Sequence, residues 1–181
     1  MVEYARSRGV RVIVEFDVPG HAASWCTGYP EVCPSPDCQE PLNVASEDTF
    51  SLIGDILGEV TSLFPDHFVH LGGDEVDTAC WSSSEEISAW LDAQGMTPDD
   101  GYAYFVQVAG PGAFPPSCHL ERHHVSSPSL PRFFFLLLQR AAEIALAASR
   151  RPVQWSEVYD HFKTSLDPST VVHVWKPETN G

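Results

Sequence analysis

Basic residues are scarce in this chain. Its 181 residues contain 10 Lys and Arg against 25 Asp and Glu, which gives a formal net charge of -15 at pH 7. Proteins that bind nucleic acid neutralise its phosphates with clustered Lys and Arg. The composition therefore predicts that nucleic acid is not a partner.

Long apolar runs are also missing. The nearest candidate, Phe133 to Leu138, is far shorter than the roughly 18 residues of a membrane span. The opening residues MVEYARSRG do not form a signal peptide and are typical of the last turns of a helix that ends at Gly9. We therefore expect no membrane span and no signal peptide in this chain, and we expect its N-terminal part to have been lost.

The cysteines show no pattern of a zinc site. None lies in a CxxC motif or a His/Cys cluster, and their odd number leaves at least one unpaired within the chain. Buried thiols remain as plausible as disulfides on composition alone. The five positions are Cys26, Cys33, Cys38, Cys80 and Cys118.

Strand and helix patterns alternate along the chain, whose apolar fraction of 43% is that of a globular protein. We expect one domain with a sizeable core and a parallel α/β sheet. Helices are predicted after Ser46, over Ser84 to Gln94, and from Thr97-Pro98 onward. The predicted strands are Val10 to Phe16, His67 to Leu71, Val153 to Trp155 and Val171 to Trp175.

Residues 108–139 interrupt the last of these helices. The segment contains Pro-Gly, Pro-Pro and a Phe/Leu run, and its removal joins Gln107 to Arg140 with apolar residues at helical spacing. We hypothesise that the segment is a non-native insertion, a translated intron, because a Val codon can supply the 5′ GT and a Gln codon the 3′ CAG. The alternative is a genuine surface insertion.

Asp74 and Glu75 are the sharpest chemical feature. They follow Gly72-Gly73 at the end of a predicted strand, where glycines let the backbone bend and approach a ligand. Sequence neighbours are poorly placed to act from opposite sides of a bond. We therefore expect one acid/base and one orienting carboxylate, against the alternative of an exposed acidic turn.

A second polar turn follows the first predicted strand. Asp17 and His21 lie just past it, and parallel strands bring their ends to one edge. His21 would then share a site with Asp74 and Glu75 and could tune a carboxyl pKa. Catalytic types of residue at successive strand ends favour a barrel over an open sheet.

Four motifs together resemble glycoside hydrolase family 20, the lysosomal and plant-type β-N-acetylhexosaminidases. They are VRVIVEFDVPGHAASW, HLGGDEV, VQWSEV and VVHVWK, in the order of the family's third to sixth strand ends. The resemblance implies that residues 1–181 are a partial catalytic (β/α)8 TIM barrel, approximately strands 3 to 6, interrupted at 108–139. It covers nearly all of the chain outside that segment.

The resemblance also implies roles for individual residues. Glu75 would be the general acid/base, Asp74 would orient the substrate's 2-acetamido group, and His21 would support Glu75. Asp17, Trp155 and Trp175 would line the substrate site. The family is a substrate-assisted exception among glycosidases, in which the acetamido oxygen attacks and forms an oxazolinium ion. The implied activity is a retaining exo-β-N-acetylhexosaminidase that removes terminal GlcNAc or GalNAc from glycans, without metal or cofactor.

The resemblance further implies a disulfide between Cys38 and Cys80, and hence an oxidising location: lysosome, vacuole or the cell exterior. The partners would be N-acetylhexosamine-terminated glycans, and the parent enzyme would be a dimer. Cys26 and Cys33 stand where the plant-type pattern has Gly and Trp.

Several family residues have no counterpart here, among them the Arg of the first strand and the Asp of the second. We therefore expect little or no activity from the isolated chain. The alternatives are an inactive truncated or mis-spliced product, a sugar-binding pseudoenzyme, and a metal-dependent hydrolase. The metal reading would use the ligands Asp17, His21, His70, Asp74 and Glu75.

Overall fold

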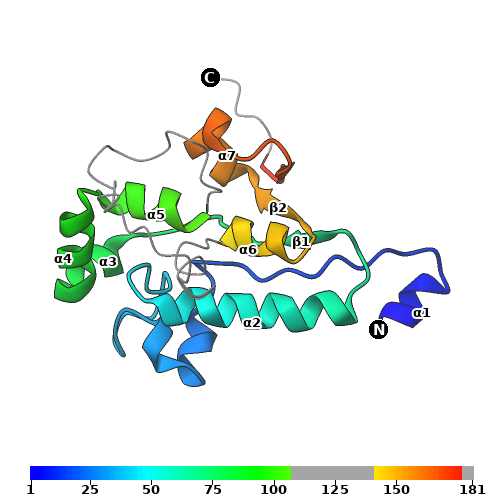
Figure 1. The fold of residues 1–181 in the computed structure, drawn as a ribbon, viewed down its shortest axis with the longest axis horizontal. Coiled ribbons are helices and arrows are strands. Elements are labelled where there is room, and N and C mark those ends of the chain that lie inside the picture. Colours follow the sequence, from blue (N-terminus) through cyan, green and yellow to red (C-terminus); the bar gives the residue numbers. More distant parts are fainter. Residues whose placement is uncertain (107–140, 177–181) are drawn as a thin grey trace, which may run out of the picture.

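The computed structural model describes residues 1–106 and 141–176. A parallel sheet lies at its centre, with β1 (Phe68–His70), β2 (Arg151–Trp155) and β3 (Val171–His173) in the order β1-β2-β3. Phe68 pairs with Arg151, and Val153 pairs with Val171. Helices surround these strands (Figure 1). The alternation of strands and helices and the parallel sheet are as predicted.

An extended segment lies beside β1 on its other edge. The Phe16 amide donates to the His70 carbonyl at 2.9 Å, and the Val18 amide donates to the Leu71 carbonyl at 3.1 Å. Hydrogen bonding to β1 begins only at Val14, whose carbonyl accepts from the His70 amide. The strand predicted over Val10 to Phe16 therefore pairs with β1 only in its second half, and the prediction was wrong for its first half. Val10 is 57% exposed, because no described strand pairs with that part of the segment.

The helices begin and end largely where local chemistry places them. Asp100 and Thr97 form a reciprocal capping box, in which each backbone amide donates to the other's side chain at 3.2 and 2.9 Å. Gly95 ends the preceding helix with φ 68°. The α-helices are α1 (Val2–Arg6), α2 (Glu47–Leu63), α3 (Ala79–Ser83), α4 (Glu85–Gln94), α5 (Pro98–Val106), α6 (Ala141–Ala147) and α7 (Ser156–Phe162).

Helix α2 begins directly after Ser46, as predicted. Ser46 occupies the N-cap position of α2, but its side chain makes no capping hydrogen bond. Glu47 and Asp48 in the first turn still favour the positive end of the helix dipole. None of the described helices is long and apolar enough to cross a membrane.

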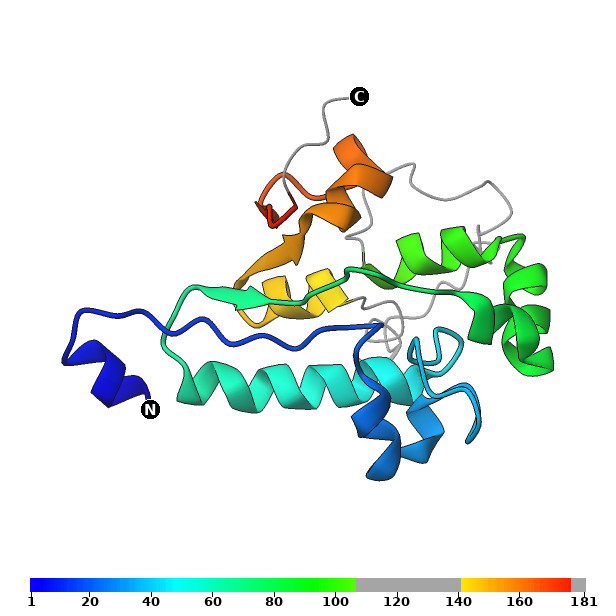
Figure 2. The ribbon, with the colours of Figure 1, turned by 180° about the vertical axis from the view of Figure 1, so that it is seen from behind.

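The core forms where α2 and α6 pack together and α6 contacts β2. Figure 2 shows α6 between α2 and the strands. Leu57 of α2, Val69 of β1 and Ala145 of α6 are all fully or almost fully buried there. A second part of the core surrounds Trp81, whose indole N–H donates to the Leu42 carbonyl at 2.9 Å. Burial of these apolar side chains supplies the main driving force for the fold.

Two disulfides brace the long segment between Val18 and α2. One joins Cys38 to Cys80, the pair that the resemblance implied. The other joins Cys26 to Cys33, which the sequence had left open. The segment contains two short 3-10 helices: η1 (Ala23–Thr27), which carries Cys26, and η2 (Pro30–Val32), which Cys33 follows. A third, η5 (Lys163–Ser165), follows α7.

The segment 108–139, hypothesised to be an insertion, lies outside the described residues. On either side of it, α5 ends at Val106 and α6 begins at Ala141. The two helices are in contact, and in the views of Figures 1 and 2 they run along nearly the same line.

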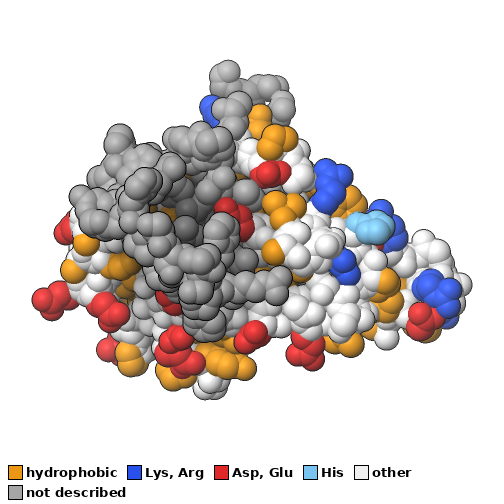
Figure 3. Space-filling model, viewed as in Figure 1, with side chains coloured by type: hydrophobic (Ala, Val, Ile, Leu, Met, Phe, Trp, Pro, Cys, Tyr) orange, Lys and Arg blue, Asp and Glu red, His pale blue; other side chains and the backbone are white. Residues whose placement is uncertain are grey.

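Charge is distributed unevenly over the surface. On the face shown in Figure 3, most of the acidic side chains lie over the left and lower parts of the molecule, whereas most of the Lys and Arg side chains lie toward the α1 end. Arg11 at that end is paired with Asp66, with 2.8 Å between Nη2 and Oδ1.

Candidate active site

The candidate site is built on a bend in the backbone at Gly72 and Gly73. These residues follow β1 and have φ values of 64° and 93°, a region that glycine enters without steric cost. A Cβ on Gly72 would collide with the Asp17 side chain, and one on Gly73 would lie 2.6 Å from Val158 Cγ2. Glycine is therefore required at both positions, as the sequence pattern suggested.

Asp74 and Glu75 leave this bend in different environments. The Asp74 side chain is 14% exposed, whereas the Glu75 side chain is 54% exposed. Glu75 has φ 53° and His21 has φ 51°, which are unusual values for residues with a side chain. Such conformations cluster at functional sites, because the surrounding structure must hold them.

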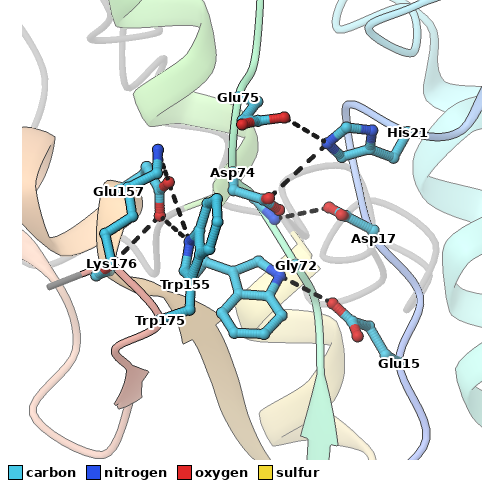
Figure 4. A network of polar contacts seen from close by, with 12 residues as sticks. Glu15, Asp17, His21, Gly72, Asp74, Glu75, Trp155, Glu157, Trp175 and Lys176 are labelled. Atoms are coloured by element: carbon cyan, nitrogen blue, oxygen red, sulfur yellow. Dashed lines mark hydrogen bonds and ion pairs between the residues drawn. The ribbon is translucent and has the colours of Figure 1, made fainter.

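His21 brings the two carboxylates together. Its Nε2 atom lies 3.8 Å from Asp74 Oδ2 and 3.7 Å from Glu75 Oε2 (Figure 4). It reaches them from the turn that follows the segment paired with β1. The structure thus gathers the three residues predicted to be catalytic, although they come from separate parts of the chain.

Asp17 lies beneath this group. Its Oδ1 atom accepts a hydrogen bond from the Gly73 amide at 2.8 Å. Burial raises the pKa of Asp17 to about 7, and the neighbouring Asp74 adds to this effect, while the Gly73 hydrogen bond and His21 oppose it. Two carboxyl groups held this close cannot both ionise easily, so Asp17 retains a proton in mildly acidic solution.

Two tryptophans stand beside the carboxylates (Figure 4). Trp155 ends β2, Trp175 follows β3, and their rings meet nearly edge to face with centroids 6.3 Å apart. Trp155 Nε1 donates to Glu15 Oε1 at 3.0 Å. Trp175 Nε1 donates to the carboxylate of Glu157 at 3.0 Å. The predicted wall residues therefore share one region with Asp74 and Glu75.

Glu15, Glu157 and Lys176 had no role assigned from the sequence. Lys176 Nζ lies 2.5 Å from Glu157 Oε1. Burial would raise the pKa of Glu157, but the hydrogen bonds from Lys176 and Trp175 outweigh it and lower the pKa. A signal was available for Glu15, which lies two residues before Asp17 in the predicted strand, because alternate strand residues share a face. Glu157 lies beyond the end of β2, in α7, where this alternation does not apply.

Below the tryptophans lies a histidine pair, His70 and His173, of which only His70 was considered from the sequence, as a metal ligand. His70 Nδ1 accepts from the Gly72 amide at 3.0 Å and lies 3.2 Å from Glu15 Oε1, and the other ring nitrogen, Nε2, faces His173 Nδ1 at 3.2 Å. Burial lowers the pKa of His70 to about 4, and His173 adds to this shift. The His173 ring stacks on Trp155 with centroids 4.2 Å apart.

A phenol reaches the bend from α5. The Tyr102 hydroxyl donates to the Gly73 carbonyl at 2.5 Å, and Tyr102 is 5% exposed. In the sequence, Tyr102 lies in the helix predicted from Thr97-Pro98 onward, and no role of its own was assigned to it. No sequence pattern marks it as polar in function, because its contact depends on the packing of α5.

Only some of the ligands named for the metal-dependent alternative lie close together. Among the described residues, Asp17, His21 and Asp74 have potential ligand atoms within 4.8 Å of one another. His70 is not available, because its ring nitrogens face the Gly72 amide and His173. Asp17 also accepts the Gly73 hydrogen bond, and His21 faces Glu75 as well as Asp74.

Comparisons with known proteins point in one direction. The model of the glycosyl hydrolase family 20 catalytic domain matches residues 1–181. The chain is 39% identical over 175 residues to beta-hexosaminidase 3 of Arabidopsis thaliana, covering 97% of this chain and 27% of the relative. It is 32% identical over 183 residues to human beta-hexosaminidase subunit beta, covering 97% of this chain and 27% of that protein.

Solved structures show the same fold. The beta-N-acetylhexosaminidase of Bacteroides fragilis gives a TM-score of 0.67 at 20% identity, over 97% of this chain and 30% of that one. A chitobiase of Flavobacterium johnsoniae gives the same TM-score and identity, over 97% of this chain and 23% of that one. The chain thus spans about a quarter to a third of the length of these proteins.

Proposed function

The chain belongs to glycosyl hydrolase family 20, and from this premise we propose that Asp74 and Glu75 are the catalytic carboxylates of a retaining exo-β-N-acetylhexosaminidase. Its substrates would be glycans that end in GlcNAc or GalNAc. The fold would be part of a (β/α)8 barrel, approximately its strands 3 to 6, which places the site at the carboxyl ends of the strands.

One observation carries this proposal. The Oδ1 atom of Asp74 is buried and receives no hydrogen bond from any described residue. A buried oxygen without a donor costs free energy, so such atoms mark places where a ligand or water supplies one. The N–H of a 2-acetamido group is a donor of the right kind.

Glu75 has the complementary property. It is more exposed than Asp74, so it can reach the oxygen between two sugars, and His21 lies 3.7 Å from its Oε2. Both carboxylates face the same nitrogen of His21, so they line one side of the site. An enzymatic nucleophile opposite the acid would need a carboxylate on the other side of the sugar. This arrangement supports participation by the substrate itself.

The reaction then proceeds in two steps. The acetamido oxygen forms a bond to the anomeric carbon as the glycosidic bond breaks, and Glu75 transfers its proton to the leaving oxygen. Asp74 stabilises the positive charge of the oxazolinium ion through its N–H. Water next attacks the anomeric carbon, Glu75 takes the proton from that water, and the acetamido group is restored with retention of configuration.

The tryptophans supply the walls of the sugar site. Trp155 and Trp175 present aromatic faces beside Asp74, suited to the apolar face of the sugar and the acetamido methyl group. Their indole N–H groups are fixed by Glu15 and Glu157, which limits the rotamers that the rings can adopt. Sugar binding is thereby directed to the same side of the site as the carboxylates.

A series of aryl glucosaminides tests this mechanism. The acyl group would carry zero, one, two or three fluorine atoms, which make its oxygen progressively less nucleophilic. We expect kcat to fall with each fluorine. Rates that are independent of fluorination would contradict participation by the substrate, and sugar binding without any turnover would instead favour the pseudoenzyme alternative.

The enzyme preparation needs a defined comparison. The 181-residue polypeptide should be assayed beside the longest product of its gene that contains these residues. We expect the longer product to carry the activity, since the matched relatives are more than three times as long as the matched segment. Strong cleavage by the 181-residue polypeptide would overturn that expectation.

The proposed location is an oxidising one, such as a lysosome, a vacuole or the cell exterior. Two disulfides among the described residues support this. Dimerisation of the parent enzyme stays a prediction. Gel filtration of the longest gene product tests dimerisation.

A further inference from the structure

The backbone N–H and C=O groups of Gly72 and Gly73 are hydrogen-bonded to four different residues. At Gly72, the amide donates to His70 Nδ1 and the carbonyl accepts from the Trp155 amide, both at 3.0 Å. At Gly73, the amide donates to Asp17 and the carbonyl accepts from the Tyr102 hydroxyl. All four polar backbone groups of the bend are therefore hydrogen-bonded.

Tyr102 differs from the other partners because it comes from a helix. Burial raises the pKa of its hydroxyl, and the nearby carboxylates of Glu157, Asp74 and Asp17 raise it further. The hydroxyl therefore stays protonated and acts as a hydrogen-bond donor to the Gly73 carbonyl. Its 2.5 Å contact spans 29 residues of sequence and lies directly before Asp74.

The packing of α5 fixes where this hydroxyl lies. One turn beyond Tyr102, the Val106 carbonyl accepts a hydrogen bond at 3.1 Å from Nε2 of Gln154, a buried residue of β2. On its other side, the Tyr102 ring meets Phe162 of α7 edge to face, with centroids 4.9 Å apart. The phenol is thus held between the sheet and α7, and its hydroxyl has one direction available.

We propose that Tyr102 is a positioning residue that sets the direction of the Asp74-Glu75 pair through the Gly73 carbonyl. The catalytic consequence rests on the proposed function. Gly73 has φ 93° and no side chain, so its own rotation is weakly restrained. Rotation there would swing both carboxylates away from His21. The hydroxyl restrains that rotation at the Gly73 carbonyl, whereas Asp17 holds the Gly73 amide.

Amide hydrogen exchange tests the restraint directly. The variant Tyr102→Phe keeps the ring and removes the hydroxyl. Tyr104→Phe is the matched control, because it removes a hydroxyl from the same helix two residues on, where the ring packs on Phe50 and Trp90. Tyr102→Leu removes the ring as well and separates packing from hydrogen bonding.

The expected result is local. Loss of one buried hydrogen bond corresponds to about a tenfold change in an opening equilibrium. In Tyr102→Phe, peptides spanning residues 70–76 should exchange about tenfold faster, while peptides from α2 stay as in the unaltered chain. Tyr104→Phe should leave residues 70–76 unchanged.

Three results would overturn the proposal. The first is exchange in Tyr102→Phe equal to that of the unaltered chain, with damage only in Tyr102→Leu, since packing alone would then explain the residue. The second is a uniform increase over the whole chain. The third is fast exchange of residues 70–76 in the unaltered chain, because the bend would then not be held.

Kinetics separate this proposal from the proposed function. In the active gene product, Tyr102→Phe should lower kcat about tenfold and change KM less than twofold, because binding contacts remain. Faster amide exchange confined to residues 70–76 in Tyr102→Phe, without hydrolysis by any variant or by the unaltered protein, would support the restraint by Tyr102 and refute the proposed hydrolase activity. Hydrolysis that depends on Glu75, together with identical amide exchange in Tyr102→Phe and Tyr104→Phe, would support the hydrolase activity and refute the restraint by Tyr102.

Discussion

The Gly73 amide donates a hydrogen bond of 2.8 Å to the Asp17 carboxylate, across 56 residues of sequence. This bond links the turn that carries His21 to the bend that carries Asp74. It also holds the Asp17 carboxyl beside that of Asp74, so the two groups share an electrostatic environment. Much of the pH behaviour of the site follows from this contact.

The variant Asp17→Asn should change how stability depends on pH. The folded-state pKa of Asp17 is raised to about 7 from an ordinary 3.8, so its stabilising contribution is fully present below about 3.8 and is lost as pH rises through 7. Urea unfolding measures this effect. Between pH 4 and pH 8, the free energy of unfolding of the unaltered chain should fall by roughly 2 kcal/mol relative to that of Asp17→Asn, allowing for screening by solvent.

His70 does not disturb this comparison. Its folded-state pKa is lowered to about 4, so its contribution is present above 6.5 and is lost as pH falls through 4. It occurs in both proteins and cancels in their difference. Asp66→Asn is a control in which the pH dependence should run the other way. The hydrogen bond from Arg11 lowers the Asp66 pKa, so the contribution of Asp66 to stability is lost as pH falls. A difference between Asp17→Asn and the unaltered chain that is flat with pH would refute the assignment.

The two disulfides should contribute unequally to stability. Cys38 and Cys80 are separated by 42 residues, whereas Cys26 and Cys33 are separated by 7. A longer closed loop removes more entropy from the unfolded chain. Replacing Cys38 and Cys80 by Ala should lower the free energy of unfolding by roughly 3 to 4 kcal/mol, and replacing Cys26 and Cys33 by roughly 2.

Denaturant unfolding of the two double variants, with Cys118 unchanged in both, measures this difference. A larger loss from the Cys26 and Cys33 variant would contradict the loop-length account. It would mean that Cys26 and Cys33, which are 8% and 7% exposed, stabilise the core mainly by packing.

Trp155 should be needed for sugar binding more than for folding. Its ring is partly exposed beside Asp74, and its N–H is held by Glu15. Trp155→Phe keeps an aromatic face but loses this hydrogen bond. We expect KM for an aryl N-acetylglucosaminide to rise about tenfold, with the midpoint of unfolding little changed. Trp90→Phe, on α4 and packed on Tyr104, is the control and should leave KM unchanged.

Removal of residues 108–139 should leave a folded chain. The helices on either side, α5 and α6, are in contact, and both bury apolar residues in one core. Joining Gln107 to Arg140 would allow one continuous helix. We expect a thermal midpoint equal to or above that of the full chain, and a higher helix content by circular dichroism.

A Gly/Ser segment of equal length is the control for this deletion. It should fold as well, since the account assigns no stabilising role to residues 108–139. Failure of both variants to fold would show that the segment is a genuine part of the structure. Sequencing the transcript gives an independent answer, because a retained intron is absent from the dominant mature message.

The strand ends were predictable because local patterns reveal them. Apolar β-branched runs, the Gly-Gly pair before Asp74 and the capping chemistry at Thr97 each act within a few residues. The membership of the site followed from parallel topology, which brings successive strand ends to one edge. That reasoning predicted that His21 shares a site with Asp74 and Glu75, whereas the place of the two tryptophans in the site was implied by the resemblance to the family.

The remainder of the site depends on tertiary packing. Tyr102 reaches Gly73 only because α5 lies against β2, and no periodicity indicates where a phenol hydroxyl ends. The pairing of His70 with His173 spans 103 residues and required the register of β1 and β3 through β2. Exposure of Val10 likewise depends on which strands lie beside it, which its own apolar sequence does not specify.

The division of labour between Glu75 and Asp74 is the central claim, and leaving-group dependence tests it most directly. Aryl N-acetylglucosaminides whose phenols range from acidic to weakly acidic would be hydrolysed by the active gene product, by Glu75→Gln and by Asp74→Asn. A general acid matters most for poor leaving groups, so Glu75→Gln should lose least on the most acidic phenol and progressively more as acidity falls. Asp74→Asn should lose a similar factor on every substrate, because it acts on the acetamido group. Equal losses across the series for Glu75→Gln, or a leaving-group dependence confined to Asp74→Asn, would contradict the assignment.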